Sequence, residues 1–450
     1  MMGHQSRGEA LFYYFRLEEH VPENHLLRLL DRHISFDFVR EKLKDSYSDT
    51  GRPSIDPELL LRILLIGYLY GVTSERKLVE ELQMHLAWRW FTGLSFDQEI
   101  PHHSTFSKNR HGRFLESNLF QELFEAIVDR CMEAGLVEGE HLSVDGSFLL
   151  ANASRLSRIP REQLPEAAHV KRTVREYLAD LEQENPVEEP AHQQDQVSTT
   201  DPDSTYATKG KGAAELGYFN NYLIDNRSCV ILGVQATAAR LSQESAAARE
   251  MITRSAERRG CFPQSVAADT TYGNGELLAW LEERNITPYI RVKESPAPKT
   301  NLYAIEKFTY DPETNSYQCP EGKQLTYLGV NPRNRNHIYR ATRKRCRECS
   351  HKSQCTTGHY RQLAIHIHEP ARQRARERAT VPAFAAAQRQ RRKVEALFAE
   401  LKNQIGLRRV RLRRMKHVRE QFFLAATAQN LKRLARFLRS RSLESATVSI

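Results

Sequence analysis

HLSVDGSFL, residues 141–149, alternates apolar and polar side chains. Leu142, Val144 and Phe148 fall on one side of this repeat, and Asp145 falls on the other. A period of two is typical of a strand, so the stretch predicts a strand with Asp145 on its polar face. Acids at the ends of strands in α/β folds project into the ligand crevice, which makes Asp145 a candidate site residue.

A second acid follows an apolar run in SVAADTTYG, residues 265–273. The run ends at Asp269, a turn containing glycine comes next, and a helix is predicted from about Glu276. A lone aspartate in such a place is more commonly a turn residue or a helix cap, and that alternative holds for Asp145 as well.

A third acid lies in RRKVEALFAELK, residues 391–402. At about 100° per residue, Arg391, Glu395 and Lys402 fall within an arc of roughly 40° on one helical face. The alternative is a solvated i,i+4 pair of Arg391 and Glu395 on an amphipathic helix. A separate apolar stripe predicts the side that faces a core, and it consists of Val394, Leu397, Phe398 and Leu401.

Three carboxylates of this kind can together hold two divalent ions. Mg²⁺ prefers carboxylate oxygen and keeps several of its waters. Two ions about 4 Å apart activate the attacking oxygen and stabilise the leaving one in phosphoryl transfer. Metal-dependent chemistry on a phosphate backbone is therefore one interpretation of the three acids.

The motifs around the acids resemble those of the DDE transposases of bacterial insertion sequences. The matching motifs are Asp145 in VDGS, Asp269 in ADTTYG, and Glu395 in the pattern Arg-x3-Glu-x6-Lys. The nearest group carries its last acid in a tyrosine–arginine–glutamate–lysine signature. The resemblance covers about residues 55–435 and implies an RNase H-like fold, with the first Asp on strand one, the second after strand four and the Glu on a late helix.

The same resemblance implies roles for individual residues. Asp145, Asp269 and Glu395 would bind two Mg²⁺ ions, with Mn²⁺ as the alternative, and Arg391 and Lys402 would contact the DNA ends of the element. One position departs from the signature. Its tyrosine would fall at 388, where this chain has Gln388, so a stacking or phenol role is lost there while the acids are kept.

The net charge of +10 is concentrated near the C-terminus. Residues 371–440 contain 20 Lys and Arg against 4 Glu, a net of +16, so the rest of the chain carries −6. Such a block predicts binding to double-stranded DNA. The alternatives are a solvated helix surface or a basic helix on a membrane, and the sparse aromatic residues of the block disfavour the second.

The chain shows no sign of export. Its first residues lack the apolar core of a signal peptide, and the longest apolar stretch, 59–71, contains Arg62 and is too short for a bilayer. We therefore expect a cytoplasmic, nucleoid-associated protein without membrane contact. Seven cysteines in such a chain argue against a disulfide framework.

The expected fold class is α/β, in four parts. We expect a helical N-terminal DNA-binding domain in 1–134, the first part of an RNase H-like catalytic domain with a mixed sheet in 135–295, a cysteine-rich insertion in 296–370, and the last catalytic helix with basic C-terminal helices in 371–450. In the first part, Asp56 and Pro57 predict a helix start. A helix beginning near Ser104 resembles a helix-turn-helix reading head with Lys108 and Arg110 as DNA contacts, and a plain helical bundle is the alternative.

The catalytic part is predicted to be interrupted. Residues 161–184 predict one amphipathic helix, and 185–205, almost without apolar residues, predict a linker or disordered loop. Strands are predicted at 217–224 and 229–235, joined by a hairpin turn. A helix over 242–258 then leads to the strand of Asp269, and another strand is predicted at 288–293.

Four of the seven cysteines lie within 37 residues: Cys319, Cys346, Cys349 and Cys355. A thiolate quartet fits tetrahedral zinc, although the first arm has one cysteine where a zinc ribbon would have two. The spacing also fits an iron–sulfur cluster. The remaining alternative is a set of free thiols.

The last stretch, 410–439, predicts a basic helix that holds DNA next to Glu395 through exposed cations, among them Arg411, Arg413 and Arg414. The function expected from all these features is a transposase that cleaves element ends and joins them to target DNA, working as a homodimer. The rivals are a metal-dependent nuclease of the same fold and a domesticated DNA-binding protein without transposition activity.

Overall fold

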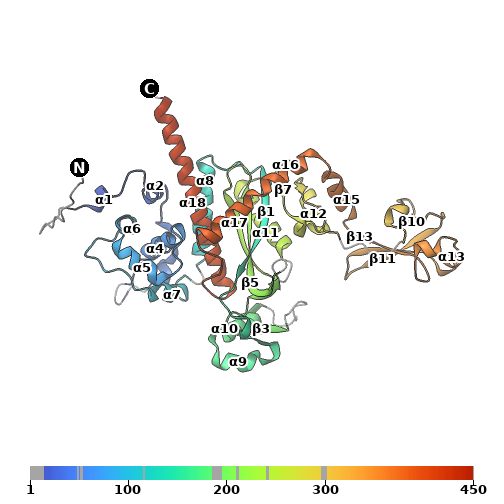
Figure 1. Cartoon of the computed structure of the whole chain (residues 1–450), viewed down its shortest axis with the longest axis horizontal. Coiled ribbons are helices and arrows are strands. Elements are labelled where there is room, and N and C mark those ends of the chain that lie inside the picture. The colour runs from blue at the N-terminus through green and yellow to red at the C-terminus, as the bar shows by residue number, and fades with distance from the viewer. Residues whose placement is uncertain are drawn as a thin grey trace, which may run out of the picture. The chain divides into compact units, whose positions relative to one another are not determined.

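The computed structural model describes residues 15–47, 50, 54–114, 117–184, 195–208, 212–239, 243–294 and 302–448 (Figure 1). The chain divides into two compact units. Unit 1 comprises residues up to 258 together with those from 392 onward, and unit 2 comprises residues 259–391. Helices and sheets occur in both units, so the predicted α/β class is confirmed.

Unit 1 begins with short helices around a buried one. Helix α4 starts as predicted, because Asp56 accepts a hydrogen bond from the Glu58 N–H at 2.9 Å and Pro57 occupies the first turn. Ser74 caps the next helix in the same way. The helices are α1 (Leu17–His20), α2 (Leu26–His33), α3 (Phe38–Leu43), α4 (Pro57–Leu69), α5 (Glu75–Met84), α6 (Leu86–Thr92), α7 (Ser104–Arg110) and α8 (Leu119–Glu133).

The sheet of unit 1 is built around its longest strand, β5 (Ala214–Asp225). β1 (His141–Leu150) pairs antiparallel with β5 along one edge, with Asp145 opposite Tyr222. β4 (Thr205–Thr208) and β6 (Ile231–Ala238) pair antiparallel with β5 along its other edge. The predicted hairpin is confirmed, since Asp225 N–H and Cys229 N–H close the turn between β5 and β6.

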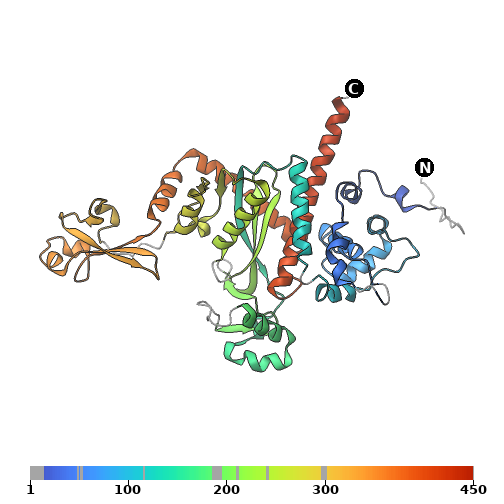
Figure 2. The same ribbon diagram turned by 180° about the vertical axis from the view of Figure 1, so that it is seen from behind.

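Helices cover this sheet. α11 (Glu244–Arg259) comes close to β6 at Gly233, where a Cβ would lie 3.0 Å from that of Met251. α17 (Lys393–Asn403) packs on β1, and α18 (Met415–Val448) packs on α8, α4 and β6. Figure 2 shows α8 running beside α18. Buried amides fix α18, because Asn430 bonds both the N–H and the C=O of Ile231, each at 2.8 Å.

An insertion in unit 1 contains β2 (Arg158–Pro160), α9 (Leu164–Val170), α10 (Arg172–Glu184) and β3 (Gln196–Ser198). The single helix predicted for 161–184 is wrong, because the backbone becomes extended at Lys171 and separates α9 from α10. The linker prediction fails for 195–205. Val197 packs with Leu164 and Val174 in a small apolar core, and β3 pairs with β2. Residues 185–194 lie outside the described residues.

Unit 2 has a parallel pair of strands, β7 (Ser265–Ala267) and β8 (Thr287–Tyr289). The strand that was predicted at 288–293 corresponds to β8 and is shorter than predicted. Gly273 after β7 allows a close approach, since a Cβ there would lie 1.8 Å from the carbonyl oxygen of Arg291. Three helices accompany the pair: α12 (Gly275–Glu282), α15 (Glu369–Arg378) and α16 (Pro382–Arg391). Arg374 and Arg378 of α15 both pair with Glu282 of α12.

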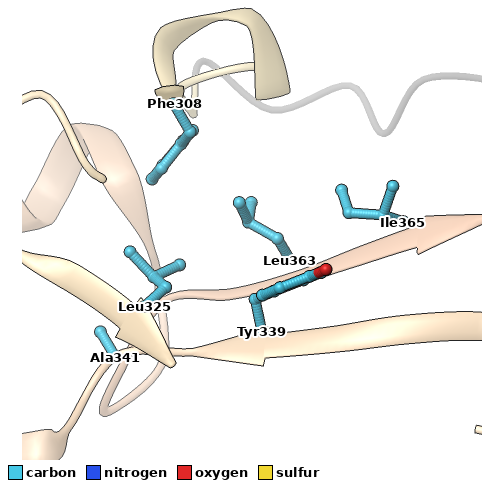
Figure 3. Close-up of a cluster of buried hydrophobic side chains, with 6 residues drawn as sticks. All are labelled: Phe308, Leu325, Tyr339, Ala341, Leu363 and Ile365. Atoms are coloured by element: carbon cyan, nitrogen blue, oxygen red, sulfur yellow. The ribbon is translucent and has the colours of Figure 1, made fainter. Parts of the chain in front are cut away.

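The rest of unit 2 is an antiparallel sheet of five strands, called here the insertion sheet. Its order is β13 (Gln362–His366), β12 (Asn336–Arg340), β11 (Gln324–Asn331), β10 (Ser316–Gln318) and β9 (Thr309–Asp311), and the short helices α13 (Arg343–Arg347) and α14 (Lys352–Cys355) follow β12. Six buried side chains form its core (Figure 3): Phe308, Leu325, Tyr339, Ala341, Leu363 and Ile365. None of the described helices of either unit is long and apolar enough to span a membrane.

Candidate functional site

Asp145 and the next residue, Gly146, are the two partly exposed residues in the middle of β1. Buried residues flank Asp145 and Gly146 on both sides, and the Gly146 N–H donates to Asp145 Oδ1 at 2.8 Å. Ser143 and Ser147, expected with Asp145 on a polar face, are buried instead. Ser143 Oγ donates to Asn226 Oδ1 at 2.6 Å, so its burial leaves no lost hydrogen bond. Asp145 is therefore the main polar side chain that this part of β1 leaves accessible.

Glu395 is exposed in the first turn of α17. The predicted apolar stripe is confirmed, since Val394, Leu397, Phe398 and Leu401 are all buried. Phe398 stacks on Tyr222, the residue opposite Asp145 in the β1–β5 register, with ring centroids 4.9 Å apart. The packing of α17 thus fixes the helix of Glu395 against the part of the sheet that carries Asp145.

Lys402 ties the Glu395 face of α17 to the Asp145 face of β1. Its Nζ donates to Ser147 Oγ at 2.6 Å. Ser147 is two residues beyond Asp145, so both side chains leave the same face of the strand. Lys402 is seven residues beyond Glu395, so both leave the same face of the helix. Asp145 of β1 and Glu395 and Lys402 of α17 are therefore on the faces of the two elements that the Lys402–Ser147 hydrogen bond joins.

Arg391 does not belong to this helical face. α16 ends at Arg391, the chain turns at Arg392, and α17 begins at Lys393. The prediction of one continuous helix over 391–402 is wrong for this reason. Arg391 belongs to unit 2, where its Nε donates to Gln388 Oε1 at 3.1 Å.

Asp269 follows β7 in unit 2 and is half-buried. Its Oδ1 accepts the N–H of Thr271 at 2.8 Å, so it caps the short helical turn Thr270–Tyr272. The alternative interpretation of this acid as a cap is therefore correct for its local structure. Its Oδ2 accepts from the hydroxyl of Thr271 at 3.3 Å, and each carboxylate oxygen keeps a further lone pair for another partner.

Gln388 has a defined structural role that the sequence pattern did not reveal. Its Nε2 donates to the carbonyl of Ala268 at 3.1 Å and to that of Tyr289 at 2.7 Å. Its Oε1 accepts from Arg391. One amide thus joins the end of β7, the end of β8 and Arg391, directly beside Asp269. A tyrosine has one O–H donor and could not make both donations.

The two candidate DNA contacts on α7 have opposite surroundings. Lys108 is exposed, as a DNA contact requires. Arg110 is buried, and its guanidinium donates to Glu75 of α5 at 2.7 Å and lies 3.8 Å from Glu420 of α18. Arg110 therefore holds three helices together, and the expectation that its side chain faces DNA is not supported by its burial.

The cations before α18 also differ from the prediction, which placed them all on an exposed helical face. Residues 410–414 precede α18 and are not helical. Arg413 is exposed, with Nε donating to the Asn152 carbonyl at 3.1 Å. Arg411 is half-buried, donates to the carbonyl of Ile405 at 3.1 Å and lies over Tyr68.

Arg414 is buried and pairs with two carboxylates of the insertion in unit 1. Its guanidinium contacts Asp180 at 2.6 Å and Asp203 at 2.8 Å, and its N–H donates to Asp201 at 2.9 Å. Burial raises the pKa of Asp201 to about 6, and its Oδ2 has no hydrogen-bond partner. Arg414 is thus a structural anchor, which corrects its prediction as an exposed cation.

The four cysteines all belong to the insertion-sheet part of unit 2, as half-buried free thiols. Cys319, Cys346 and Cys355 pack against the core of the sheet, and burial raises the pKa of Cys355. Across the residues that the structure describes, no three His, Cys, Asp or Glu side chains are grouped closely enough to hold a metal ion. The same holds for Asp145, Asp269 and Glu395, so the metal centres predicted at the cysteines and at the acids both stay predictions.

Comparisons with protein families place transposase domains in two parts of the chain. A transposase domain model (DUF772) matches residues 15–112, which contain α1 to α7. A second model, described as a transposase DDE domain, matches residues 318–435, which contain Glu395, Lys402 and the four cysteines. No curated protein sequence matches the chain.

Among solved structures, the chain is similar to the piggyBac transposase in a synaptic complex with hairpin DNA. The identity is 9%, the TM-score is 0.33, and the match covers 92% of this chain and 80% of that one.

Proposed function

We propose that this chain is a DDE transposase of an insertion sequence, which cleaves DNA at the ends of its element and joins them to target DNA. The matches of residues 15–112 and 318–435 to transposase domain models support this proposal. In the first reaction, water attacks a phosphodiester at the element end and releases a 3′-hydroxyl. In the second, that 3′-hydroxyl attacks a phosphodiester of the target and displaces its 3′ oxygen. Positioning and charge neutralisation are the main tasks of a protein in such chemistry.

We infer that Asp145, Asp269 and Glu395 are the metal ligands, on an RNase H-like catalytic domain. Carboxylate oxygens are the donors that Mg²⁺ prefers, and Mn²⁺ accepts the same set. When bound, two such ions supply activation of the nucleophile and neutralisation of the leaving oxygen. The observation that carries this proposal is the α17–β1 contact, where Lys402 bonds Ser147 beside Asp145 on the helical face that exposes Glu395.

Lys402 and Arg391 are the cations that we propose to contact the cleaved DNA end. Ser147 holds the Nζ of Lys402, which reduces the freedom lost when that ammonium group meets a phosphate. In the same way, the hydrogen bond from Arg391 to Gln388 reduces the conformational freedom that the guanidinium would lose on binding a phosphate. Lys108 and Arg413 are exposed cations for duplex DNA farther from the reacting bond. Two element ends need two active sites, so we propose a homodimer in the working complex.

The experiment that tests this function is a strand-transfer assay with linear DNA that carries the element's own terminal repeats. The element ends are found as short inverted repeats that flank the gene. Products joined to target DNA in the presence of Mg²⁺ support a transposase. Cleavage without joining would instead identify a nuclease, and binding without cleavage would identify a domesticated DNA-binding protein.

A further inference from the structure

The insertion sheet borders a large open cavity that the catalytic residues do not use. Its volume is about 1180 Å³, and all of its lining residues belong to unit 2. A typical small-molecule pocket is roughly 300–1,000 Å³, so this cavity is a groove rather than a closed pocket. Its lining includes Phe308, Tyr339 and Ile365, which Figure 3 shows among the side chains of the sheet core.

Four tyrosines from neighbouring strands form a continuous row along the groove. The ring centroids of Tyr310 and Tyr317 are 5.1 Å apart, those of Tyr317 and Tyr339 are 4.8 Å apart, and those of Tyr339 and Tyr327 are 5.3 Å apart. The row comes from β9, β10, β12 and β11. Aromatic rings in such contact support each other, so the four rings form one packed aromatic cluster along the groove.

The two ends of the row are open. Tyr310 is 45% exposed and Tyr327 is 37% exposed, whereas Tyr339 between them is 5% exposed. Their hydroxyl groups have partners, since Tyr310 donates to Asn315 Oδ1 at 3.1 Å and the Tyr327 hydroxyl bonds His337 Nδ1 at 3.2 Å. The rings are thus held in place while their faces stay accessible. A ring fixed in this way loses little conformational entropy when a flat ligand stacks on it.

The charges around the groove allow a nucleic acid to approach. Residues 302–368 carry 11 Lys and Arg against 5 Asp and Glu, a net of +6. Two lining carboxylates, Glu294 and Glu369, are neutralised by Arg372 and Arg376 at 2.7–2.9 Å. A third, Glu306, is exposed. Basic surroundings attract phosphates, while the aromatic row itself offers no charge to them.

We propose that this groove binds unpaired nucleobases, stacked on Tyr310 and Tyr327. Every base has a π-face, and exposed aromatic rings on a part of the protein with a net positive charge are a common arrangement for single-stranded nucleic acid. The lining itself holds Glu294, Glu306 and Glu369 against Arg376, so the positive charge lies around the groove and not in it. An aliphatic partner would not need rings with fixed hydroxyl groups. The proposal rests on the proposed function, because a strand that has been cut at the element end can unpair beside the break. We propose that such unpaired segments of the DNA strand bind in the groove.

The test uses the full-length protein and a single-stranded oligonucleotide that contains the fluorescent base 2-aminopurine, with its duplex as the reference. Stacking on a tyrosine quenches this base. We expect the wild-type protein to quench it in the single strand. We expect the Tyr310→Leu/Tyr327→Leu variant to lose the quenching and to bind the single strand about tenfold to a hundredfold more weakly, with duplex affinity unchanged.

Two controls separate stacking from other effects. Tyr310→Phe/Tyr327→Phe keeps the rings but loses the hydrogen bonds that fix them, so it should still quench the base, with a smaller loss of affinity than the leucine variant. Tyr360→Leu removes a tyrosine of equal exposure (36%) that lies under Arg340 and does not line the groove, so it should behave as wild type. The single variants Tyr310→Leu and Tyr327→Leu decide the question if the double variant does not fold.

The proposal would be overturned if the wild-type protein did not quench 2-aminopurine. It would also be overturned if the leucine variants quenched it as strongly as the wild-type protein does. A protein that quenches the single strand but never joins DNA would overturn the proposed function and leave base binding in place.

Discussion

Helix α17 and the segment that follows it, residues 404–420, carry the same kinds of charged side chain in opposite surroundings. On α17, Glu395 is exposed and Lys402 is held at its Nζ by a neutral serine. In the segment, Arg414 is buried between two carboxylates, and Glu420 lies beside the buried Arg110. Glu395 and Lys402 remain available to a substrate, whereas Arg414 and Glu420 hold the fold. Charge alone therefore does not identify a DNA contact.

The largest expected effect breaks the first region. Replacing Asp145 or Asp269 with Asn, or Glu395 with Gln, should lower Mg²⁺-dependent cleavage at least about a hundredfold, because each removes one proposed ligand charge with no change of shape. Binding to uncleaved ends, measured in parallel, should stay close to wild type. Near-normal cleavage by any one variant removes that residue from the ligand set.

Glu400 supplies the matched control on the same helix. It pairs with Arg433 of α18 at 2.8 Å, and both side chains are largely buried. Glu400→Gln should therefore lower the melting temperature and leave cleavage per folded molecule unchanged. Glu395→Gln should show the reverse pattern.

The second region is tested by two adjacent arginines. Arg414→Met leaves Asp180 and Asp203 without their cation and should lower the free energy of unfolding by about 3 kcal/mol, with no change in the salt dependence of DNA binding. Arg413→Met should leave stability unchanged and flatten the plot of log affinity against log salt by about 0.9, the value of one phosphate contact. Denaturant unfolding and binding titrations measure the two effects. If the salt dependence of DNA binding is unchanged in Arg413→Met, then Arg413 does not contact a phosphate of DNA.

The buried acid next to Arg414 should make stability depend on pH. The folded pKa of Asp201 is about 6, above the usual value of 3.8, so the folded state binds a proton that the unfolded state has released between these values. Stability is then full below about pH 4 and decreases as the pH rises through 6, by on the order of 2 kcal/mol from this group. Asp201→Asn should remove this dependence, because an amide can also accept from Tyr218 and Arg414. A wild-type slope in the Asn variant would assign the dependence to another group.

The smallest expected effect concerns Gln388. Gln388→Leu loses both donations to the ends of β7 and β8 and the contact with Arg391, so kcat for cleavage should fall about tenfold, with a smaller rise in KM for DNA because Arg391 is a proposed DNA contact. Gln388→Tyr should not restore the rate, since one O–H cannot serve two carbonyls. A rise in KM alone would show that Gln388 acts on DNA binding instead of on the position of its neighbours.

Local patterns predicted what local physics determines. The start of α4 at Asp56, the hairpin from β5 to β6, and the apolar stripe of α17 depend on neighbours a few residues away, and all three are confirmed. The burial of Arg414 depends on Asp180 and Asp203, more than 200 residues earlier in the chain. No pattern around residue 414 contains that information.

The same limit explains the other differences. The helix break at Arg392 separates Arg391 from Glu395 although the sequence there favours a helix on both sides. Gln388 was read as a lost tyrosine, and its two carbonyl partners lie about a hundred residues or more away in sequence. Stretches poor in apolar residues can still order when their few apolar side chains find a core, as Val197 does.

The central claim, that Asp145, Asp269 and Glu395 bind the catalytic metal ions, is tested most directly by replacing each acid with cysteine and measuring cleavage with two metals. Mg²⁺ takes oxygen ligands, whereas a softer ion tolerates sulfur. Each folded cysteine variant should be inactive with Mg²⁺ and should recover cleavage with Mn²⁺. A variant that stays active with Mg²⁺, or that regains nothing with Mn²⁺ while the wild-type protein is active with both, would contradict the claim.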